Sequence, residues 1–257
     1  MGLSKETDYP DFIKIQGEQF STELTELNII IRKLTKNDIA SLQYMTNLTS
    51  LSLTDFALYP TKIGDLTPLT ELKNLKALRL SGLKIKNIAP LSKLTKLTHL
   101  DLEGNQINNI LPLGELVNLT FLQLFSNQIS DITPLASLKK LTDLNLCGNQ
   151  IRDVSALTGL KKLTRLDLGT NQISDITPLG NLMNLTRLCL DKNKITDISV
   201  LSKLKKLTTL LLHFNHIKDI APLVRLLNLK ELWLTDNPVN DWVHTAHVDD
   251  VFGRPYS

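Results

Sequence analysis

The side chains best suited to chemistry are an acid–base group near residue 100 and two cysteines. His99, Asp101 and Glu103 alternate along the chain, so an extended strand would present all three on one face. A histidine beside carboxylates could transfer protons, but a strand face open to water neither shifts a pKa nor encloses a substrate. The chain also has no phosphate-binding glycine loop, no H-E-x-x-H and no G-x-S-x-G. We therefore expect no catalytic residues, no enzymatic activity and no cofactor.

Cys147 and Cys189 are the two cysteines of the chain. Two cysteines do not make a disulfide framework. The repeat described below places them two strands apart, about 10 Å, which is beyond the reach of a disulfide bond. His213 shares no strand row with them, so the sequence predicts exposed free thiols and no metal site.

A period of 22 residues organises the chain around these residues. Seven asparagines follow one another at this spacing, each preceded by the pattern L-x-x-L-x-L-x-x. An isoleucine follows two residues after each of them except the last, where Val239 takes its place. The pattern predicts a repeat protein with a ladder of structural asparagines. These asparagines are Asn105, Asn127, Asn149, Asn171, Asn193, Asn215 and Asn237.

Each part of the repeat predicts a different element. Leu100-x-Leu102 has the period of two that is typical of a short strand. Asn105 lies where the chain must turn, and its amide can bond the backbone of its own loop and of the neighbouring loop. Thr133-Pro134 indicates a helix start, with a threonine cap before a proline at the first helical position. About six residues then remain before the next strand, which is room for one or two 3₁₀ turns.

The repeats divide the chain into three parts. Residues 1–23 are a leader segment with a β cap at Ile13–Phe20, residues 24–240 are nine repeats and a truncated tenth, and residues 241–257 are a C-terminal cap and tail. The first two repeats have 24 and 27 residues, and the extra residues at 56–62 are expected to bulge outward. Leu83 replaces the asparagine of the third repeat. The C-terminal cap is expected to cover the last leucines with Trp242, Val243, Val248, Val251 and Phe252.

The repeat resembles that of the leucine-rich-repeat family, and its length is similar to the 22-residue bacterial subtype typified by internalins. The phrase N-Q-I-S-D-I-T-P-L occurs twice, at Asn127–Leu135 and Asn171–Leu179, and the resemblance extends from about Leu24 to Asp241. It implies an α/β solenoid: a curved leucine-rich-repeat stack with a parallel concave β-sheet and short 3₁₀ or helical turns on the convex side. Internalins begin with a helical cap, whereas this chain indicates a β cap, so the chain is internalin-like.

The concave sheet is the usual binding surface of such solenoids. Its outward positions are the third, fifth and seventh of each L-x-x-L-x-L-x-x-N unit. The first repeats place small polar residues there, whereas later repeats place aromatic and charged residues, which are typical anchors of protein interfaces. Arg165 should stand between Asp143 and Arg187, which predicts partial neutralisation. The candidate partner-binding residues are His99, Phe121, Phe125, Arg165, Arg187, Leu211, His213 and Trp233.

Opposite charges recur on the two edges of the repeats. Asp131, Asp153 and their equivalents follow the asparagine turn, where a carboxylate can assist the turn. Lysine pairs such as Lys139-Lys140 precede the strands on the other edge. Both edges are interpreted as solvated surfaces, with a partner that uses the lysines as the alternative.

Composition and charge favour a non-catalytic protein-binding module. With 29 basic and 26 acidic residues, the net charge of +3 is too even to indicate nucleic acid or an anionic membrane as partner. No apolar run approaches the roughly 18 residues that a membrane helix needs, so no membrane insertion is expected. We expect a monomer that binds a partner protein on its concave face.

Two alternative functions and two locations stay open. The chain could be an intracellular regulatory subunit of an enzyme, similar to a eukaryotic phosphatase regulator with repeats of the same length. It could also bind carbohydrate or cell wall, which would require a row of exposed aromatic residues. The resemblance to internalins implies secretion or display at the cell surface, whereas the polar residues 1–10 show no signal peptide and would indicate the cytoplasm.

Overall fold

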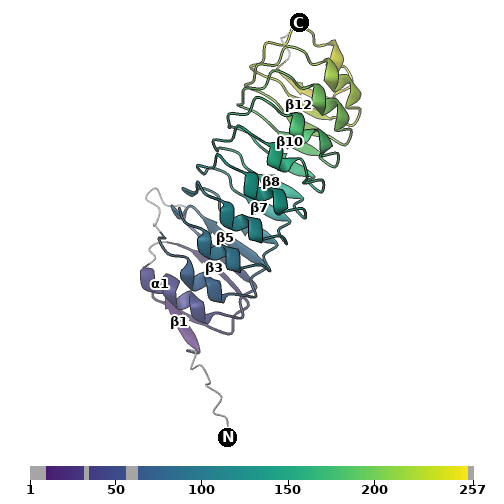
Figure 1. The fold of residues 1–257 in the computed structure, drawn as a ribbon. Helices are drawn as coiled ribbons and strands as arrows, with labels where there is room; N and C mark the ends of the chain where they lie inside the picture. Colours follow the sequence, from purple (N-terminus) through teal and green to yellow (C-terminus); the bar gives the residue numbers. More distant parts are fainter. Residues whose placement is uncertain (1–9, 32–34, 56–62, 254–257) are drawn as a thin grey trace.

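The repeats form an elongated, open stack in the computed structural model, which describes residues 10–31, 35–55 and 63–253. Figure 1 shows the first and the last described repeats, purple and yellow, at opposite ends of the stack. The expected bulge at Phe56–Lys62 lies outside the described residues. The strands are β1 (Phe12–Ile15), β2 (Glu18–Ser21), β3 (Glu26–Ile30), β4 (Ser50–Thr54), β5 (Ala77–Ser81), β6 (His99–Asp101), β7 (Phe121–Gln123), β8 (Asp143–Asn145), β9 (Arg165–Asp167), β10 (Arg187–Cys189), β11 (Thr209–Leu211), β12 (Glu231–Trp233) and β13 (Asp250–Phe252).

One α-helix and a series of short 3₁₀ helices, labelled η, connect the described strands. The α-helix α1 spans Lys36–Ser41 in the first repeat. The 3₁₀ helices are η1 (Leu42–Tyr44), η2 (Thr67–Glu71), η3 (Ala89–Lys93), η4 (Leu111–Glu115), η5 (Thr133–Ser137), η6 (Ser155–Leu157), η7 (Thr177–Asn181), η8 (Ser199–Lys203), η9 (Ala221–Arg225) and η10 (Val243–Thr245).

Strands β3 to β13 form one sheet whose strand order follows the sequence. The neighbouring strands are parallel and in matched register, so that Leu122 lies between Leu100 and Leu144. The repeat period sets this register, because each repeat returns its leucines to the same side of the sheet. The predicted fold class is confirmed. The sequence predicted ten strands, and the sheet has one more because Asp250–Phe252 pairs with β12.

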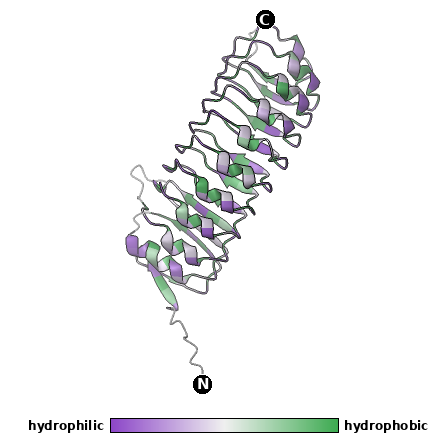
Figure 2. Ribbon diagram, in the orientation of Figure 1, coloured by the Kyte–Doolittle hydropathy of each residue, from purple (hydrophilic) through white to green (hydrophobic). Residues whose placement is uncertain are grey.

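Leucines and isoleucines fill the space between the sheet and the short helices. Leu144 and Leu166 on neighbouring strands are 2% and 1% exposed, and Leu135 and Leu157 on the helical side are fully buried. Figure 2 shows hydrophobic residues recurring at the same places along the whole stack. Since a repeat contacts mainly the repeats before and after it, burial between neighbours stabilises the solenoid.

The asparagine ladder is confirmed, and its bonds explain why this residue type recurs. Asn127 Nδ2 donates to the Leu124 carbonyl in its own loop (3.1 Å) and to the Leu102 carbonyl of the preceding repeat (3.0 Å). Its Oδ1 accepts from the Ile107 N–H of the preceding repeat (3.0 Å). A side-chain amide offers a donor and an acceptor at one position. It therefore satisfies the backbone N–H and carbonyl groups of the turn, which have no partner in the sheet. The same bonds recur at Asn149, Asn171, Asn193, Asn215 and Asn237.

The 3₁₀ helices begin differently from the sequence prediction. Helix η5 starts at Thr133 itself, with Pro134 as its second residue, and no threonine hydroxyl caps it. The cap is Asp131, whose Oδ1 accepts from the Thr133 N–H at 2.8 Å. The predicted threonine cap was wrong because a carboxylate two residues before the helix already reaches its first free N–H. Aspartates at the equivalent positions do the same, which confirms that they assist the turn: Asp153, Asp175, Asp197 and Asp219.

A hairpin and α1 cover the N-terminal end of the sheet. Strands β1 and β2 pair antiparallel around Gln16 and Gly17, which both have positive φ (53° and 85°), as a tight two-residue turn requires. Asp38 of α1 ties the two parts together, because its Oδ1 accepts from Gln16 N at 3.0 Å and its Oδ2 from Thr35 N at 2.6 Å. Burial would raise the pKa of Asp38, but the bonds from Thr35 and Gln16 outweigh burial and lower that pKa.

The C-terminal end is covered by part of the predicted cap. Val248 is buried, and Trp242 and Val251 pack partly buried against the core. Val243 and Phe252, predicted to join them, are 66% and 42% exposed. Phe252 lies on the outer side because Val251, its neighbour on the same strand, already points inward.

Candidate protein-binding surface

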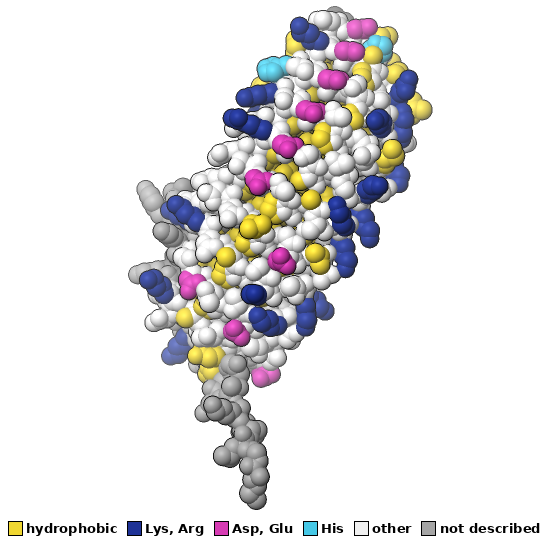
Figure 3. Space-filling view, in the orientation of Figure 1, with side chains coloured by type: hydrophobic (Ala, Val, Ile, Leu, Met, Phe, Trp, Pro, Cys, Tyr) yellow, Lys and Arg dark blue, Asp and Glu magenta, His cyan; other side chains and the backbone are white. Residues whose placement is uncertain are grey.

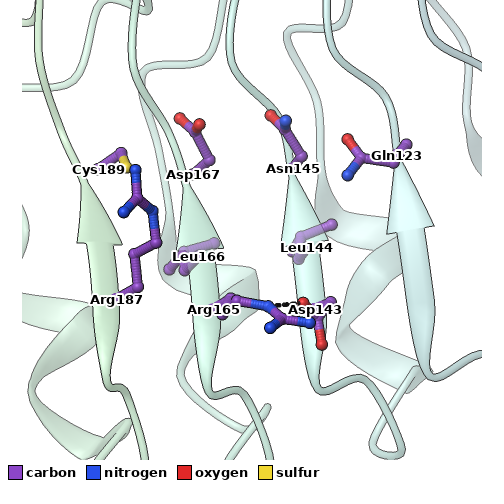
Figure 4. Close-up of a pocket in the computed structure, with 9 residues that line it drawn as sticks. All are labelled: Gln123, Asp143, Leu144, Asn145, Arg165, Leu166, Asp167, Arg187 and Cys189. Carbon is purple, nitrogen blue, oxygen red and sulfur yellow. Dashed lines mark hydrogen bonds and ion pairs between the residues drawn. The ribbon is translucent and has the colours of Figure 1, made fainter. Parts of the chain in front are cut away.

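The concave face is the outer surface of the parallel sheet and carries the third, fifth and seventh positions of each repeat. In β6, His99 and Asp101 are accessible to solvent while Leu100 between them is buried. The same alternation holds in β7, β8, β9 and β11. In β10 the fifth position is buried, because Cys189 lies beneath the side chain of Arg187 (Figure 4).

An aromatic group stands on β6 and β7. The rings of His99 and Phe121 stack with centroids 5.8 Å apart. Phe125, just past the end of β7, is 37% exposed. Beside them, Arg79 Nε forms an ion pair with Asp101 Oδ2 at 3.0 Å. His99, Phe121 and Phe125 therefore form one group, and the carboxylate of Asp101 is engaged with an arginine rather than with His99.

A shallow hollow lies in the centre of the face, across β7 to β10. Figure 4 shows Gln123, Asn145 and Asp167 side by side at the fifth position of neighbouring strands. Arg165 forms an ion pair with Asp143, as the sequence predicted. Of the two predicted arginines, Arg165 is therefore held by a carboxylate of the next strand, while Arg187 extends along its own strand (Figure 4).

Burial changes the ionisation of the groups around this hollow. Burial raises the pKa of Asp167, and the nearby Asp191 raises it further, against opposing effects from the Gly169 N–H and Arg187. Burial also raises the pKa of Cys147 to about 11 and that of Cys189 to about 12, with contributions from the same two aspartates.

Both cysteines are free thiols, as predicted, but neither is exposed as expected. Cys147 is half-buried and Cys189 is 4% exposed, because the side chains of neighbouring strands close over them. With such high pKa values both remain protonated near neutral pH and are poor nucleophiles.

A second aromatic group lies on β11 to β13. The ring of His213 is 5.9 Å from that of Trp233 and 5.6 Å from that of Phe214. Trp233 stacks on Phe252 with centroids 4.2 Å apart, so one face of the indole is covered and the residue is half-buried. Leu211, also half-buried, pairs in register with Trp233. The predicted residues Leu211, His213 and Trp233 are thus brought together, four to six strands away from the first aromatic group.

Phe214 and Phe252 belong to the second group, but neither was among the partner-binding residues predicted from the sequence, where Phe252 was assigned to the C-terminal cap. Phe214 is at the eighth position of its repeat, directly before a ladder asparagine, where its φ is 55°. Other repeats have Gly104 or Gly148 there, and a bulky residue with positive φ is a genuine outlier. That contrast could have identified Phe214. Phe252 was not assigned to this surface because β13 lies beyond the repeat pattern.

Neither a metal-binding cluster nor a membrane-spanning helix is present in the part of the chain that the structure describes. In residues 10–31, 35–55 and 63–253, no group of three or more His, Cys, Asp or Glu side chains could hold a metal ion. No helix in the same ranges is long and apolar enough to cross a membrane.

A parallel sheet in sequence order, one short 3₁₀ helix per repeat and a buried asparagine ladder together define a leucine-rich solenoid. A family model described as leucine-rich repeats in two copies matches residues 73–115, 117–159, 139–181, 183–223 and 205–244. The chain therefore belongs to the leucine-rich repeat family. No curated protein sequence gives a significant match to the chain.

Solved structures of internalins from Listeria monocytogenes are similar to this chain. Internalin C2 is 33% identical, with a TM-score of 0.59 over 83% of this chain and 82% of its own. A second internalin, inlF, is 25% identical, with a TM-score of 0.65 over 91% of this chain and 89% of its own. The predicted internalin-like character is confirmed.

A plant receptor shares the same architecture. The leucine-rich-repeat ectodomain of the membrane receptor kinase GASSHO1/SCHENGEN3 from Arabidopsis thaliana, solved in complex with CASPARIAN STRIP INTEGRITY FACTOR 2, is 25% identical. Its TM-score is 0.72, and the match covers 84% of this chain but 28% of the receptor. Leucine-rich repeats are thus commonly protein–protein interaction modules.

Proposed function

We propose that this protein is a non-catalytic interaction module that binds a partner protein on its concave face. The supporting observation is the unequal use of that face. Strands β3 to β5 carry mostly small or polar side chains, whereas two aromatic groups stand on β6–β7 and β11–β13. Rings at these positions do not build the core, which the inward leucines already fill. Aromatic and arginine side chains on an otherwise polar face are the usual anchors of an interface.

The spacing of the two groups sets the size of the partner. From β6 to β12 there are six strand intervals, which correspond to about 29 Å. One partner that contacts both groups would cover a standard protein interface. His99, Phe121 and Phe125 would form one contact, Leu211, His213 and Trp233 the other, with Arg165 and Arg187 between them.

The test uses immobilised full-length protein to capture partners from an extract, followed by binding of the purified partner. The variant is Phe121→Ala/Phe125→Ala/Trp233→Ala, which removes rings from both aromatic groups. We expect it to weaken binding at least about a hundredfold, because single aromatic anchors contribute about 2 kcal/mol or more.

The matched control removes exposed apolar side chains that lie off the sheet. Leu111→Ala/Val224→Ala/Val243→Ala removes residues that are 69%, 46% and 66% exposed. It should bind like the wild type. If the ring variant recovers the same partner with unchanged affinity, the concave anchors are wrong.

A further inference from the structure

A second surface of different chemistry runs along the edge of the solenoid. We define the lysine edge as the eight turns that join a 3₁₀ helix to the next strand, from η2 to η9. Each turn contributes two residues, and none of the sixteen is acidic. Eight are lysines: Lys73, Lys96, Lys139, Lys140, Lys161, Lys162, Lys205 and Lys206.

The lysines of this edge have no acidic partner. The ion pairs among the described residues involve Arg79, Arg165, His213 and His244 but no lysine. Some ammonium groups bond neutral amides instead: Lys96 Nζ lies 2.9 Å from Asn74 Oδ1, and Lys140 Nζ lies 2.7 Å from Asn118 Oδ1. These bonds hold the ammonium groups in place without neutralising them. The edge is therefore a row of positive charges that no acidic side chain among the described residues neutralises.

Exposed aliphatic side chains interrupt the row at matched positions. Four repeats lack a lysine at the first position of the turn. One of them has Thr95 there, and the other three have Val117, Met183 and Leu227. These side chains are 48%, 55% and 78% exposed. Figure 3 shows the result along one long edge, where dark-blue and yellow side chains alternate, well separated from an evenly spaced line of magenta side chains.

We propose that the lysine edge binds the surface of an anionic lipid bilayer. Ammonium groups on flexible stems suit lipid phosphates, and aliphatic tips between them suit the boundary of the acyl chains. A soluble polyanion would make no use of the aliphatic tips. A row that follows the long axis of an elongated stack also suits a planar surface. The whole-chain charge of +3 conceals this edge, because the aspartates lie at the opposite ends of the 3₁₀ helices.

The test is co-sedimentation of the full chain with vesicles of phosphatidylcholine alone or of phosphatidylcholine mixed with phosphatidylglycerol. The protein should sediment with the mixed vesicles and remain in solution with the neutral ones. Binding should weaken as salt is raised, because salt screens surface charge. Absence of binding to the mixed vesicles at low salt would overturn the proposal.

The charge variant is Lys139→Gln/Lys161→Gln. Each lysine near an anionic surface changes affinity about fivefold, so the pair should weaken binding about 25-fold. The matched control, Lys194→Gln/Lys218→Gln, removes the same charge from exposed positions near the asparagine turns. This control should retain most of the vesicle binding. If both variants lose the same amount of binding, the lysine edge has no specific role and the proposal is wrong.

The aliphatic contribution is tested with two exposed leucines. Leu227→Gln on the edge should weaken vesicle binding severalfold, whereas Leu111→Gln, on η4 and 69% exposed, should not. Circular dichroism melts check that all variants fold. If soluble polyglutamate binds the wild type as tightly as the vesicles do, and Leu227→Gln changes neither, the edge recognises acidic protein segments and the bilayer proposal is wrong. The concave-face variants should not affect vesicle binding, so the two proposals stand or fall separately.

Discussion

The eighth position of each repeat shows how much a single residue can be constrained by its place in the stack. From the third repeat onward the residue there has a positive φ, as in Gly82, Gly148, Thr170 and Lys192. Its N–H donates to the next repeat, as Thr170 N does to Asp191 O at 2.8 Å. The conformation therefore extends the hydrogen-bonded ladder beyond the strand, and glycine adopts it without steric cost. A β-branched residue such as Thr170 does not.

Replacement of Thr170 by glycine should therefore stabilise the protein. A left-handed conformation costs a non-glycine residue roughly 1–2 kcal/mol, which glycine avoids. Part of this gain is offset, because glycine makes the unfolded chain more flexible and so stabilises the unfolded state. We expect Thr170→Gly to raise the free energy of unfolding by about 0.5–1 kcal/mol in urea titrations. The reverse change, Gly148→Ala, should lower it by a similar amount, and a loss of stability in Thr170→Gly would contradict the strain.

The raised pKa of Asp167 predicts a pH dependence of the opposite sign to that of a typical aspartate. Its charged form is disfavoured in the fold by burial and by Asp191, so ionisation destabilises the folded state at neutral pH. Asp167→Asn keeps an oxygen for the Gly169 N–H and removes the charge. We therefore expect the variant to be more stable than the wild type at pH 7.

This advantage should vanish as the pH falls through the pKa of Asp167, where the wild-type carboxyl becomes neutral too. Thermal melts of both proteins between pH 7 and pH 3 measure the difference. A variant that is less stable at pH 7, or a difference that grows in acid, would show that the charge of Asp167 is favourable.

At the scale of elements, the repeat predicted the sheet and the short helices well because each is enforced by a strict pattern. A period-two pair of leucines leaves one possible strand face, and six residues leave room for little more than a 3₁₀ turn. The helix cap was missed because Asp131 and Thr133 are both good caps, and the choice depends on which side chain reaches the free N–H. Strand β13 was missed because Asp250–Phe252 lies outside the pattern.

The candidate site was only partly predictable. The repeat pattern placed His99, Phe121 and Trp233 on one face, because the period of the repeat sets the register of neighbouring strands. Whether an aromatic ring on that face is accessible to a partner depends on side chains that the repeat pattern does not describe. Phe252 covers one face of Trp233, and Arg187 lies over Cys189. Such contacts arise from side-chain reach across strands, which spacing along the chain does not determine.

The ladder makes the asparagine turn the element most sensitive to a small substitution. Asn149 makes bonds of 3.0 Å to the Leu124 and Leu146 carbonyls and accepts from Ile129 N at 3.0 Å. Asn149→Ala leaves these backbone groups unpaired in a buried turn, so it should cost about 1–3 kcal/mol in chemical unfolding. Asn118→Ala, at the more exposed lysine edge, should cost less than about 0.5 kcal/mol. Equal losses would remove the ladder's special role.

At the scale of the whole molecule, the solenoid separates its surfaces because each repeat position is repeated along the length. The aspartates recur in a line at the starts of the 3₁₀ helices, the lysine edge lies at the opposite ends of these helices (Figure 3), and the aromatic groups stand on the sheet. A globular fold mixes such positions, whereas a stack turns each into a stripe. The same one-dimensional order limits how stability spreads, since a repeat is supported by its two neighbours and by little else.

Leucine-to-alanine substitutions at the middle and at the end of the stack should therefore destabilise different numbers of repeats. Leu144 on β8 and Leu232 on β12 are both buried, so each loss of side chain leaves a cavity that costs about 2–5 kcal/mol. Leu144→Ala lies between repeats on both sides and should lower the midpoint of global unfolding. Leu232→Ala is followed by a single strand and a short cap, so the last repeats can open alone. Amide hydrogen exchange should then accelerate across β6 to β10 in the first variant and across β11 to β13 in the second. Faster exchange at β5 in Leu232→Ala would show that the stack unfolds as one unit, and the nearest-neighbour description would not hold for this protein.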